Sequence, residues 1–276
     1  MSTRRGVAPA PAAHRTRRRG AGRRTAGRLV VLAAAVAAAV AAPSLLARPT
    51  TGAGAPPAAP AAAPPAAAAA LLPSAPAFDL TARSTTDPAS PWVVVNKQHP
   101  LDPLGYAPAS LTLVAGKEVS SLAAPDLQAM LAAAEADGVR PTLVSGYRSY
   151  GHQERVHQRA VASQGVEQAE RVSARPGHSE HQTGLAVDLG SRTDPSCDLQ
   201  DCFGATPEGA WLAAHAASYG FLLRYTAADS DVTGYSPEAW HYRWVGADLL
   251  REMADRGVGT LEELFGVSGG PVYSTP

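Results

Sequence analysis

Cysteine is almost absent from this 276-residue sequence, which contains only Cys197 and Cys202. Two cysteines rule out a multi-disulfide scaffold, and without a second pair they make a poor metal site. Their spacing in CDLQDC permits a small disulfide-closed loop, which suits an exported protein. An excess of charge is also missing. The 24 basic and 24 acidic residues balance, so charge gives no argument for nucleic acid binding, and we expect none.

Long apolar runs are missing too. The longest, residues 29–42, is about 14 residues, shorter than the roughly 20 that a spanning helix needs. It follows a strongly basic stretch, a pattern typical of a secretory signal peptide. Extension of the run past Pro43 would instead make an uncleaved membrane anchor. Either reading predicts an extracytoplasmic protein, secreted or anchored to the outer face of the cytoplasmic membrane.

The chain divides into three parts by composition. We predict a basic leader with a signal peptide or anchor over residues 1–48, and a spacer rich in Ala and Pro over 49–77 that has too few large apolar residues to fold. We expect residues 78–276 to form one folded domain. The order of its elements predicts an α+β fold, with helices packed on a mainly antiparallel central sheet. The expected strands are 93–95, 142–146, 185–189, 221–225 and the run from 238; the expected helices are 126–137, 150–163, 166–171, 207–219, 247–256 and 261–265.

The stretch RPGHSEHQTGLAVDLG, residues 175–190, places His181 seven residues before Asp188. In the expected strand, Leu185, Val187 and Leu189 point to one face, and Ala186 and Asp188 to the other. A carboxylate beside a small residue has room for a partner, and a metal ion is one candidate. The alternative is that these polar residues are structural.

A second stretch, EAWHYRWV, places Glu238 three residues before His241. His181, Asp188 and His241 together make a three-ligand set for Zn²⁺ with a fourth position open for water. Glu238 is then free to act as a general base. The competing interpretation of Glu238 is a surface carboxylate paired with Arg243, and His178 could support the ligands from behind.

Three segments in order, SGYRSY (145–150), ARPGHSEHQTGLAVDLG (174–190) and EAWHYRWVG (238–246), resemble the signatures of the VanY-type D-alanyl-D-alanine carboxypeptidases. The resemblance runs from about Trp92 to Phe265. One departure is Ala239, where many relatives have proline. The resemblance implies the Hedgehog/DD-peptidase fold, a zinc cofactor and peptidoglycan stem peptides as the partner. We expect a monomer.

The resemblance also assigns substrate contacts. It makes Arg148 the receptor for the C-terminal carboxylate, with Gln153 and Ser179 hydrogen-bonded to the terminal D-alanine. A structural salt bridge is the alternative for Arg148. The function it implies is hydrolysis of the terminal D-Ala-D-Ala bond of stem peptides. The rival functions are a cell-wall D,D-dipeptidase or endopeptidase, and a non-catalytic zinc-stabilised wall-binding module.

Overall fold

The structure, a computed structural model, describes residues 77–274. The expected leader, 1–48, and nearly all of the expected spacer, 49–77, lie outside the described residues. Among residues 77–274, the helices are too short or too polar to cross a membrane.

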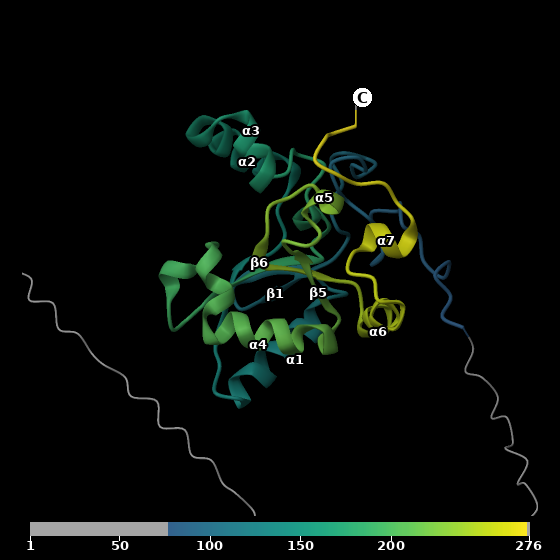
Figure 1. Ribbon diagram of the computed structural model, residues 1–276. Helices are drawn as coiled ribbons and strands as arrows, with labels where there is room; N and C mark the ends of the chain where they lie inside the picture. Colours follow the sequence, from purple (N-terminus) through teal and green to yellow (C-terminus); the bar gives the residue numbers. More distant parts are fainter. Residues whose placement is uncertain (1–76, 275–276) are drawn as a thin grey trace, which may run out of the picture. The chain divides into compact units, whose positions relative to one another are not determined.

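Four antiparallel strands form the central sheet in the order β3–β4–β6–β5. Figure 1 labels two of them, β5 and β6. Their bounds are Pro141–Ser145 (β3), Ala186–Ser191 (β4), Phe221–Tyr225 (β5) and Glu238–Trp244 (β6). The expected strands at 142–146, 185–189, 221–225 and from 238 are therefore confirmed, as is the α+β class. Because β4 lies between β3 and β6, any side chain on it has neighbours on both sides.

The six expected helices are present in the expected order, and one short helix over residues 230–233 was not predicted. Their bounds are Ala124–Ala136 (α1), Tyr150–Gln164 (α2), Val166–Val172 (α3), Pro207–His215 (α4), Ser230–Thr233 (α5), Ala247–Arg256 (α6) and Leu261–Phe265 (α7). Short 3₁₀ helices cover Glu180–Thr183 (η1), Pro195–Cys197 (η2), Asp201–Ala205 (η3) and Ala216–Tyr219 (η4). The helix expected over 207–219 is thus α4 followed by the tighter turn η4. Thr206 caps α4 by accepting a hydrogen bond from the Gly209 amide at 3.0 Å.

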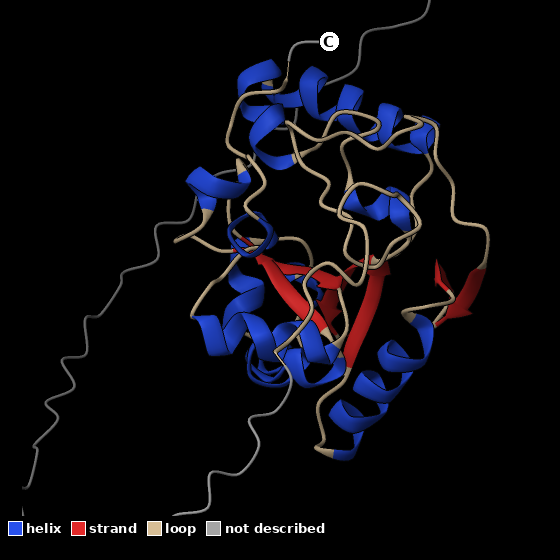
Figure 2. Cartoon of the chain, turned by 90° about the vertical axis from the view of Figure 1, so that its right-hand side faces the viewer, coloured by secondary structure: helices blue, strands red, loops and turns tan. Residues whose placement is uncertain are grey.

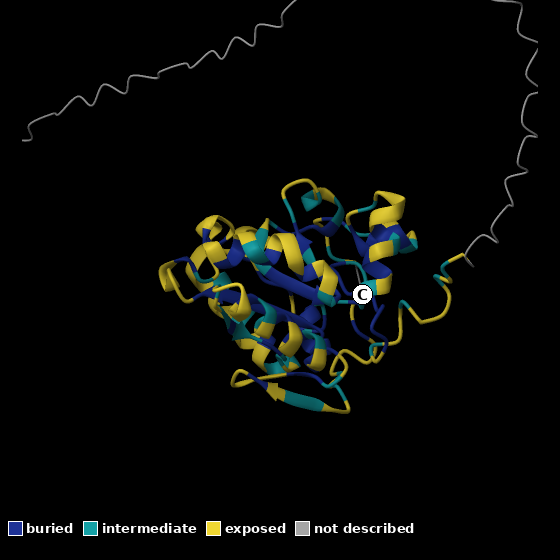
Figure 3. Ribbon diagram, turned by 90° about the horizontal axis from the view of Figure 1, so that it is seen from below, coloured by how far each residue is buried: buried dark blue, intermediate teal, exposed yellow. Residues whose placement is uncertain are grey.

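One face of the sheet is apolar and packs on α1 and α4, which lie below it in Figure 1. The core there combines Leu127 and Met130 of α1, Val187 of β4, Leu212 of α4 and Tyr242 of β6. Figure 2 shows helices on both sides of the strands. In Figure 3 the strands in the middle of the domain are largely buried, and β4 is buried along its whole length, whereas the outward faces of the helices are exposed. The apolar face of β4 predicted from the sequence therefore holds the domain together, and its other face is left for polar residues.

The strand expected at 93–95 is wrong. Val93, Val94 and Val95 are buried but form a loop, because their backbone serves other partners. The Val93 carbonyl accepts a hydrogen bond from the Arg243 side chain at 3.0 Å, and the Val94 amide donates to Thr85. A hairpin of β1 (Leu111–Val114) and β2 (Lys117–Ser120) was not predicted.

Candidate active site

The pairing of β4 with β6 brings two of the three predicted ligands together. Asp188 of β4 is paired in register with His241 of β6, so their side chains stand side by side on the polar face. His181 lies on η1, just ahead of β4. Gly184, with a φ of 69°, ends that turn and starts the path into the strand. A short turn followed by a strand thus places His181 back over Asp188.

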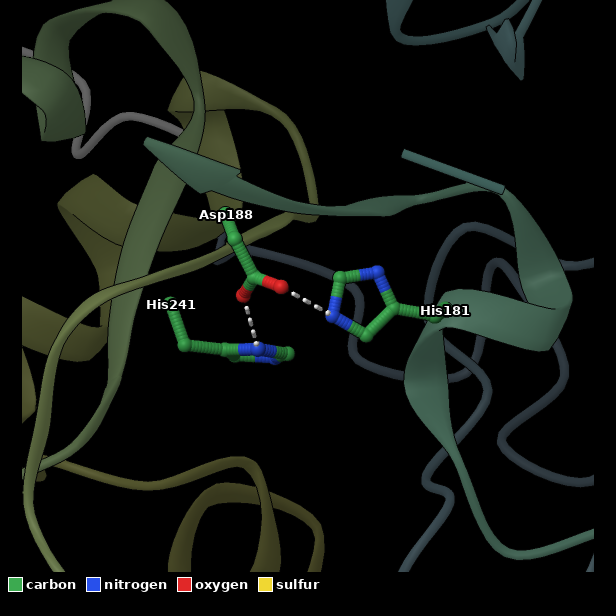
Figure 4. A group of neighbouring side chains, drawn as sticks. All are labelled: His181, Asp188 and His241. Carbon is green, nitrogen blue, oxygen red and sulfur yellow. Dashed lines mark hydrogen bonds and ion pairs between the residues drawn. The ribbon is translucent and has the colours of Figure 1, made fainter. Parts of the chain in front are cut away.

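The three predicted ligands meet in a buried cluster (Figure 4). One ligand atom from each of His181, Asp188 and His241 lies within 4.8 Å of the others. The two Asp188 oxygens divide between the rings: Oδ2 is 3.1 Å from Nε2 of His181, and Oδ1 is 3.1 Å from Nδ1 of His241. The imidazoles are nearly at right angles to each other, with centroids 5.0 Å apart. The Asp188 carboxylate therefore lies between the inner nitrogens of the two histidine rings.

The outer nitrogen of each ring is held by a hydrogen-bond acceptor. Nδ1 of His181 is 2.8 Å from the Gly146 carbonyl, and Nε2 of His241 is 3.2 Å from Oε2 of Glu180. A backbone carbonyl, like an ionised carboxylate, can only accept, so these nitrogens carry the protons. The inner nitrogens, which face the predicted ligand Asp188, are then the ones left to bind a metal ion once any proton on them is displaced. Gly146 is itself required by packing, because a Cβ there would lie 2.3 Å from the Glu118 carbonyl oxygen.

These residues fit a zinc ion. Two neutral imidazole nitrogens and a carboxylate are donors that zinc accepts in catalytic sites, with one position left for water or substrate. Supporting acceptors on the far side of each histidine are the usual second layer of such sites. Burial lowers the pKa of His181 and favours its neutral, metal-binding form. Burial alone would raise the pKa of Asp188, but His181 and His241 hold it well below its usual range.

Glu238 lies beside this cluster. Its Oε2 is 3.9 Å from Nδ1 of His241, and it lines the same cavity. The proposed surface pairing with Arg243 does not occur, because Arg243 is committed to Glu180 and to two backbone carbonyls. In the metal-free protein, burial raises the pKa of Glu238 to about 8. A carboxyl whose pKa lies near neutral pH is suited to taking up and releasing a proton.

Arg148 follows β3 and points toward the cluster. Its guanidinium donates to Oε1 of Gln153 at 2.9 Å and to Oγ of Ser145 at 3.0 Å, while Nη2 lies 3.6 Å from Asp188. The two shortest contacts are to neutral groups, so they orient the guanidinium without cancelling its charge. It remains able to bind a carboxylate.

The two other predicted substrate residues line the cavity as well. Gln153 is buried, and both ends of its amide are engaged: Oε1 with Arg148 and Nε2 with the Ala174 carbonyl at 2.6 Å. The structure therefore shows it orienting Arg148. A contact from Gln153 or from the buried Ser179 to D-alanine stays a prediction.

The cluster forms the floor of a cavity of about 520 Å³. One wall comes from α2 and α3, through Val156, Ala160 and Val172. Further lining residues, Leu199, Gln200 and Asp201, belong to the loop closed by the Cys197–Cys202 disulfide, which the structure confirms. Trp240 lines the cavity and also packs on the core. The cavity lining does not include Tyr147.

Sequence reasoning missed a layer of charged residues under the site. Glu180 binds His241 and also accepts hydrogen bonds from Arg224 at 2.9 Å and Arg243 at 3.2 Å. The expectation that His178 supports the ligands is wrong, because its ring contacts the Asn96 carbonyl and the edge of Tyr273. Charged residues on buried strands were the available signal, since such groups are rarely buried unless paired.

Comparison with known proteins gives a consistent picture. The family model VanY, described as D-alanyl-D-alanine carboxypeptidase, matches residues 116–247. YodJ of Bacillus subtilis, which bears the name of a carboxypeptidase, is 36% identical over 189 residues, or 65% of this chain and 68% of that protein. A D-alanyl-D-alanine carboxypeptidase of Enterococcus faecalis is 34% identical over 182 residues, covering 62% of this chain and 64% of the relative.

Solved structures agree. The LdcB LD-carboxypeptidase superposes with a TM-score of 0.59 at 36% identity, over 66% of this chain and 88% of that one. A VanY D,D-pentapeptidase from a VanB-type resistance cassette, a point mutant solved in complex with Zn(II), gives a TM-score of 0.55 at 32% identity, over 64% and 99%. Together with the ligand set, these likenesses define the class as zinc metallopeptidases of the Hedgehog/DD-peptidase fold. Within it, the chain belongs to the VanY family of D-alanyl-D-alanine carboxypeptidases.

Proposed function

We propose that this protein is an exported zinc D,D-carboxypeptidase that removes the terminal D-alanine from peptidoglycan stem peptides. One observation carries the proposal: an arginine oriented by neutral partners stands beside a buried His-Asp-His set and a spare glutamate. A carboxypeptidase must recognise a free carboxylate one residue beyond the bond that it cuts. Arg148 offers that recognition at the required place.

The division of labour follows from the geometry. Bound zinc would supply a water of lowered pKa and a polarised scissile carbonyl. His181, Asp188 and His241 would hold the ion, and Arg148 would fix the C-terminal carboxylate through paired hydrogen bonds. Glu238 would accept a proton from the attacking water and donate it to the leaving amine. The walls of the cavity would hold the rest of the stem peptide and limit access of water.

A related activity is the second candidate. The structures of LdcB and of DacB from a Streptococcus, both described as L,D-carboxypeptidases, match at 36% identity. Such an enzyme also binds a terminal carboxylate, so Arg148 suits both. The difference lies in the configuration of the residue before the cut.

Export is supported by the basic stretch and apolar run at the N-terminus and by the Cys197–Cys202 disulfide, because disulfides persist mainly in oxidising compartments. Fractionation of cells that express the whole chain would test it. Recovery of the protein in the cytoplasm with both thiols open to alkylation would contradict the proposal.

Defined muropeptides give the decisive experiment for the reaction. The purified protein is incubated with a pentapeptide ending in D-Ala-D-Ala and with the matching tetrapeptide, with and without a chelator, and the products are identified by mass spectrometry. We expect loss of one alanine from the pentapeptide only, abolished by the chelator. Cleavage of the tetrapeptide alone would establish the L,D activity, internal cuts an endopeptidase, and release of D-Ala-D-Ala a dipeptidase. No cleavage with zinc bound would favour the binding module.

A further inference from the structure

A buried ionic network lies beneath His241, and the catalytic reaction as described above makes no use of it. We propose that Glu180 is a positioning residue for the zinc site, and that segments on both sides of the family-matched region lock it in place. The proposal rests on the protein being a zinc enzyme, but not on which peptide bond it cuts.

The contact of Glu180 with His241 decides which ring nitrogen faces the metal. Because an ionised carboxylate can only accept, Nε2 of His241 donates to Glu180, so the nitrogen left to give up its proton and bind zinc is Nδ1, which lies beside the predicted ligand Asp188. His181 uses the opposite arrangement, with Nδ1 bonded to the Gly146 carbonyl and Nε2 facing inward. One ligand is thus held by the backbone and the other by a single charged side chain. The second support can be removed directly, by substituting the side chain that provides it.

Two arginines fix Glu180 in turn. Arg224 and Arg243 both donate to Oε1, which leaves Oε2 for His241. The side chains of Glu180, Arg224 and Arg243 are fully buried. Removing one partner from a buried ion pair leaves an uncompensated charge, so such groups keep their arrangement together. The position of Oε2 therefore depends on both arginines.

The outer contacts of the arginines come from the two flanks of the domain. Arg224 donates to Glu262 on α7 at 2.7 Å, and Glu262 also accepts from Asn96 at 3.0 Å. Arg243 donates to the carbonyls of Pro91 and Val93 at 3.1 and 3.0 Å. All of these outer partners lie outside residues 116–247, the part matched by the family model. This explains why the loop at 91–96 is buried without being a strand.

The alternative is that the network only stabilises the fold. A metal readout separates the two roles, because a merely stabilising network would leave the zinc affinity of the folded protein unchanged. The matched control is Glu208, another buried carboxylate, which accepts hydrogen bonds from Ser191, Arg192 and Thr193 at the end of β4. It has no contact with His241.

The test compares Glu180→Gln with Glu208→Gln in the whole chain. Zinc affinity is measured by competition with a chelator, and the geometry of the site by the visible spectrum of the cobalt-substituted protein. We expect Glu180→Gln to bind zinc about ten- to a hundredfold more weakly, the usual cost of losing such a supporting contact, with an altered cobalt spectrum. Glu208→Gln should match the wild type in both zinc affinity and cobalt spectrum. Wild-type affinity and spectrum in Glu180→Gln, or equal losses in both variants, would overturn the proposal.

Two further measurements do not depend on the folding of Glu180→Gln. In the zinc-loaded wild type, nitrogen NMR should show His241 ligated through Nδ1 and protonated at Nε2; the reverse assignment would disprove the positioning role. Glu262→Gln should also weaken zinc binding, by a smaller factor than Glu180→Gln. An unchanged zinc affinity in Glu262→Gln would refute the part of the proposal in which the flanking segments hold Glu180 in place. Because these readouts use zinc and no peptide, a wild type that binds zinc but cuts no muropeptide would refute the proposed reaction alone.

Discussion

The two sides of the cleft are built differently. The sheet side holds Asp188 and His241 on paired strands and His181 on the turn before β4, and these residues are all buried, as is the Glu180 carboxylate beneath them. The opposite side consists of helices α2 and α3 and a disulfide-closed loop whose Leu199 is 40% exposed. Polar groups on the sheet side have protein partners, whereas much of the other side contacts solvent. We infer that the chemistry is fixed by the sheet and that substrate preference is determined by the walls.

The largest expected effect is on the sheet side. His181→Ala or His241→Ala should abolish zinc binding and peptide cleavage together, because each removes one of three ligands. Metal content of the purified proteins, measured by elemental analysis, checks the first loss, and alanine release checks the second. His215→Ala is the control, since this histidine is exposed on α4 and stacks on Trp211. Full zinc occupancy in both ligand variants would show that the ligands are elsewhere.

Glu238→Gln should separate chemistry from metal binding on the same side. General acid–base steps contribute about 10²–10⁴-fold, so kcat should fall by that factor or more while zinc content stays at the wild-type level. Single-turnover measurements on the pentapeptide would show whether the chemical step is affected. Near-normal turnover would move the base to another residue and favour a non-catalytic role for the site.

Arg148→Ala probes the boundary between the two sides. Hydrogen bonds to charged groups are worth about 1.5–3 kcal/mol, so kcat/KM on a free-acid substrate should fall by about ten- to a hundredfold with zinc retained. Amidation of the substrate should cost the wild type a similar factor and the variant little more. Arg155→Ala, an exposed arginine of α2 that does not line the cavity, is the control. Equal rates on amidated and free-acid peptides would refute the receptor role.

Removal of zinc should make the buried side sensitive to pH. In the metal-free protein, burial raises the pKa of Glu238 from 4.5 to about 8. Burial alone would lower the pKa of His241, but hydrogen bonds to Asp188 and Glu180 raise it from 6.5 to about 9. Both groups bind protons more tightly in the folded state than in the unfolded state. Their contribution to the free energy of unfolding is fully present below the unfolded-state pKa and is lost as pH rises through the folded-state pKa.

The free energy of unfolding of the zinc-free protein should therefore fall as pH rises, through Glu238 between about pH 4.5 and 8 and through His241 between about pH 6.5 and 9. Zinc binding must displace the proton on His241, so zinc affinity should rise over the same range. Urea unfolding at several pH values, with chelator or with excess zinc, measures both trends. A zinc-free stability that rises with pH would contradict the assigned pKa directions.

The smallest effect should come from the outer wall. Replacing both Cys197 and Cys202 with serine frees the loop that carries Leu199, and should raise KM a few-fold without changing zinc affinity. The chain-entropy model gives a stability loss of about 2 kcal/mol for so short a loop. Calorimetry measures the loss of stability, and steady-state kinetics measure the rise in KM. A matching loss of zinc affinity would show that the two sides are more closely coupled than their construction indicates.

The sequence predicted most of the sheet and all three members of the His-Asp-His cluster because their signals are local. Alternation over Leu185–Leu189, the Thr206 cap and the segment after Glu238 each depend on neighbours in the chain. The β1–β2 hairpin escaped because its turn, Ala115-Gly116, has positive φ at both residues without the Asn-Gly or Asp-Gly pair that signals such turns. The ionic network was not predicted because its members are far apart in the sequence: Asn96, Glu180, Arg224, Arg243 and Glu262. Only the fold brings them together.

Gly146 shows how far that dependence on the fold extends. Its carbonyl holds His181, and its missing side chain lets β2 approach so closely that the Glu118 carbonyl also accepts from the Tyr147 amide at 2.6 Å. A methyl group at this position would push the hairpin away and tilt the imidazole with it. In a genetic screen for loss of activity, Gly146→Ala should consequently be recovered together with His181→Ala and His241→Ala, although Gly146 is not one of the predicted metal or substrate contacts.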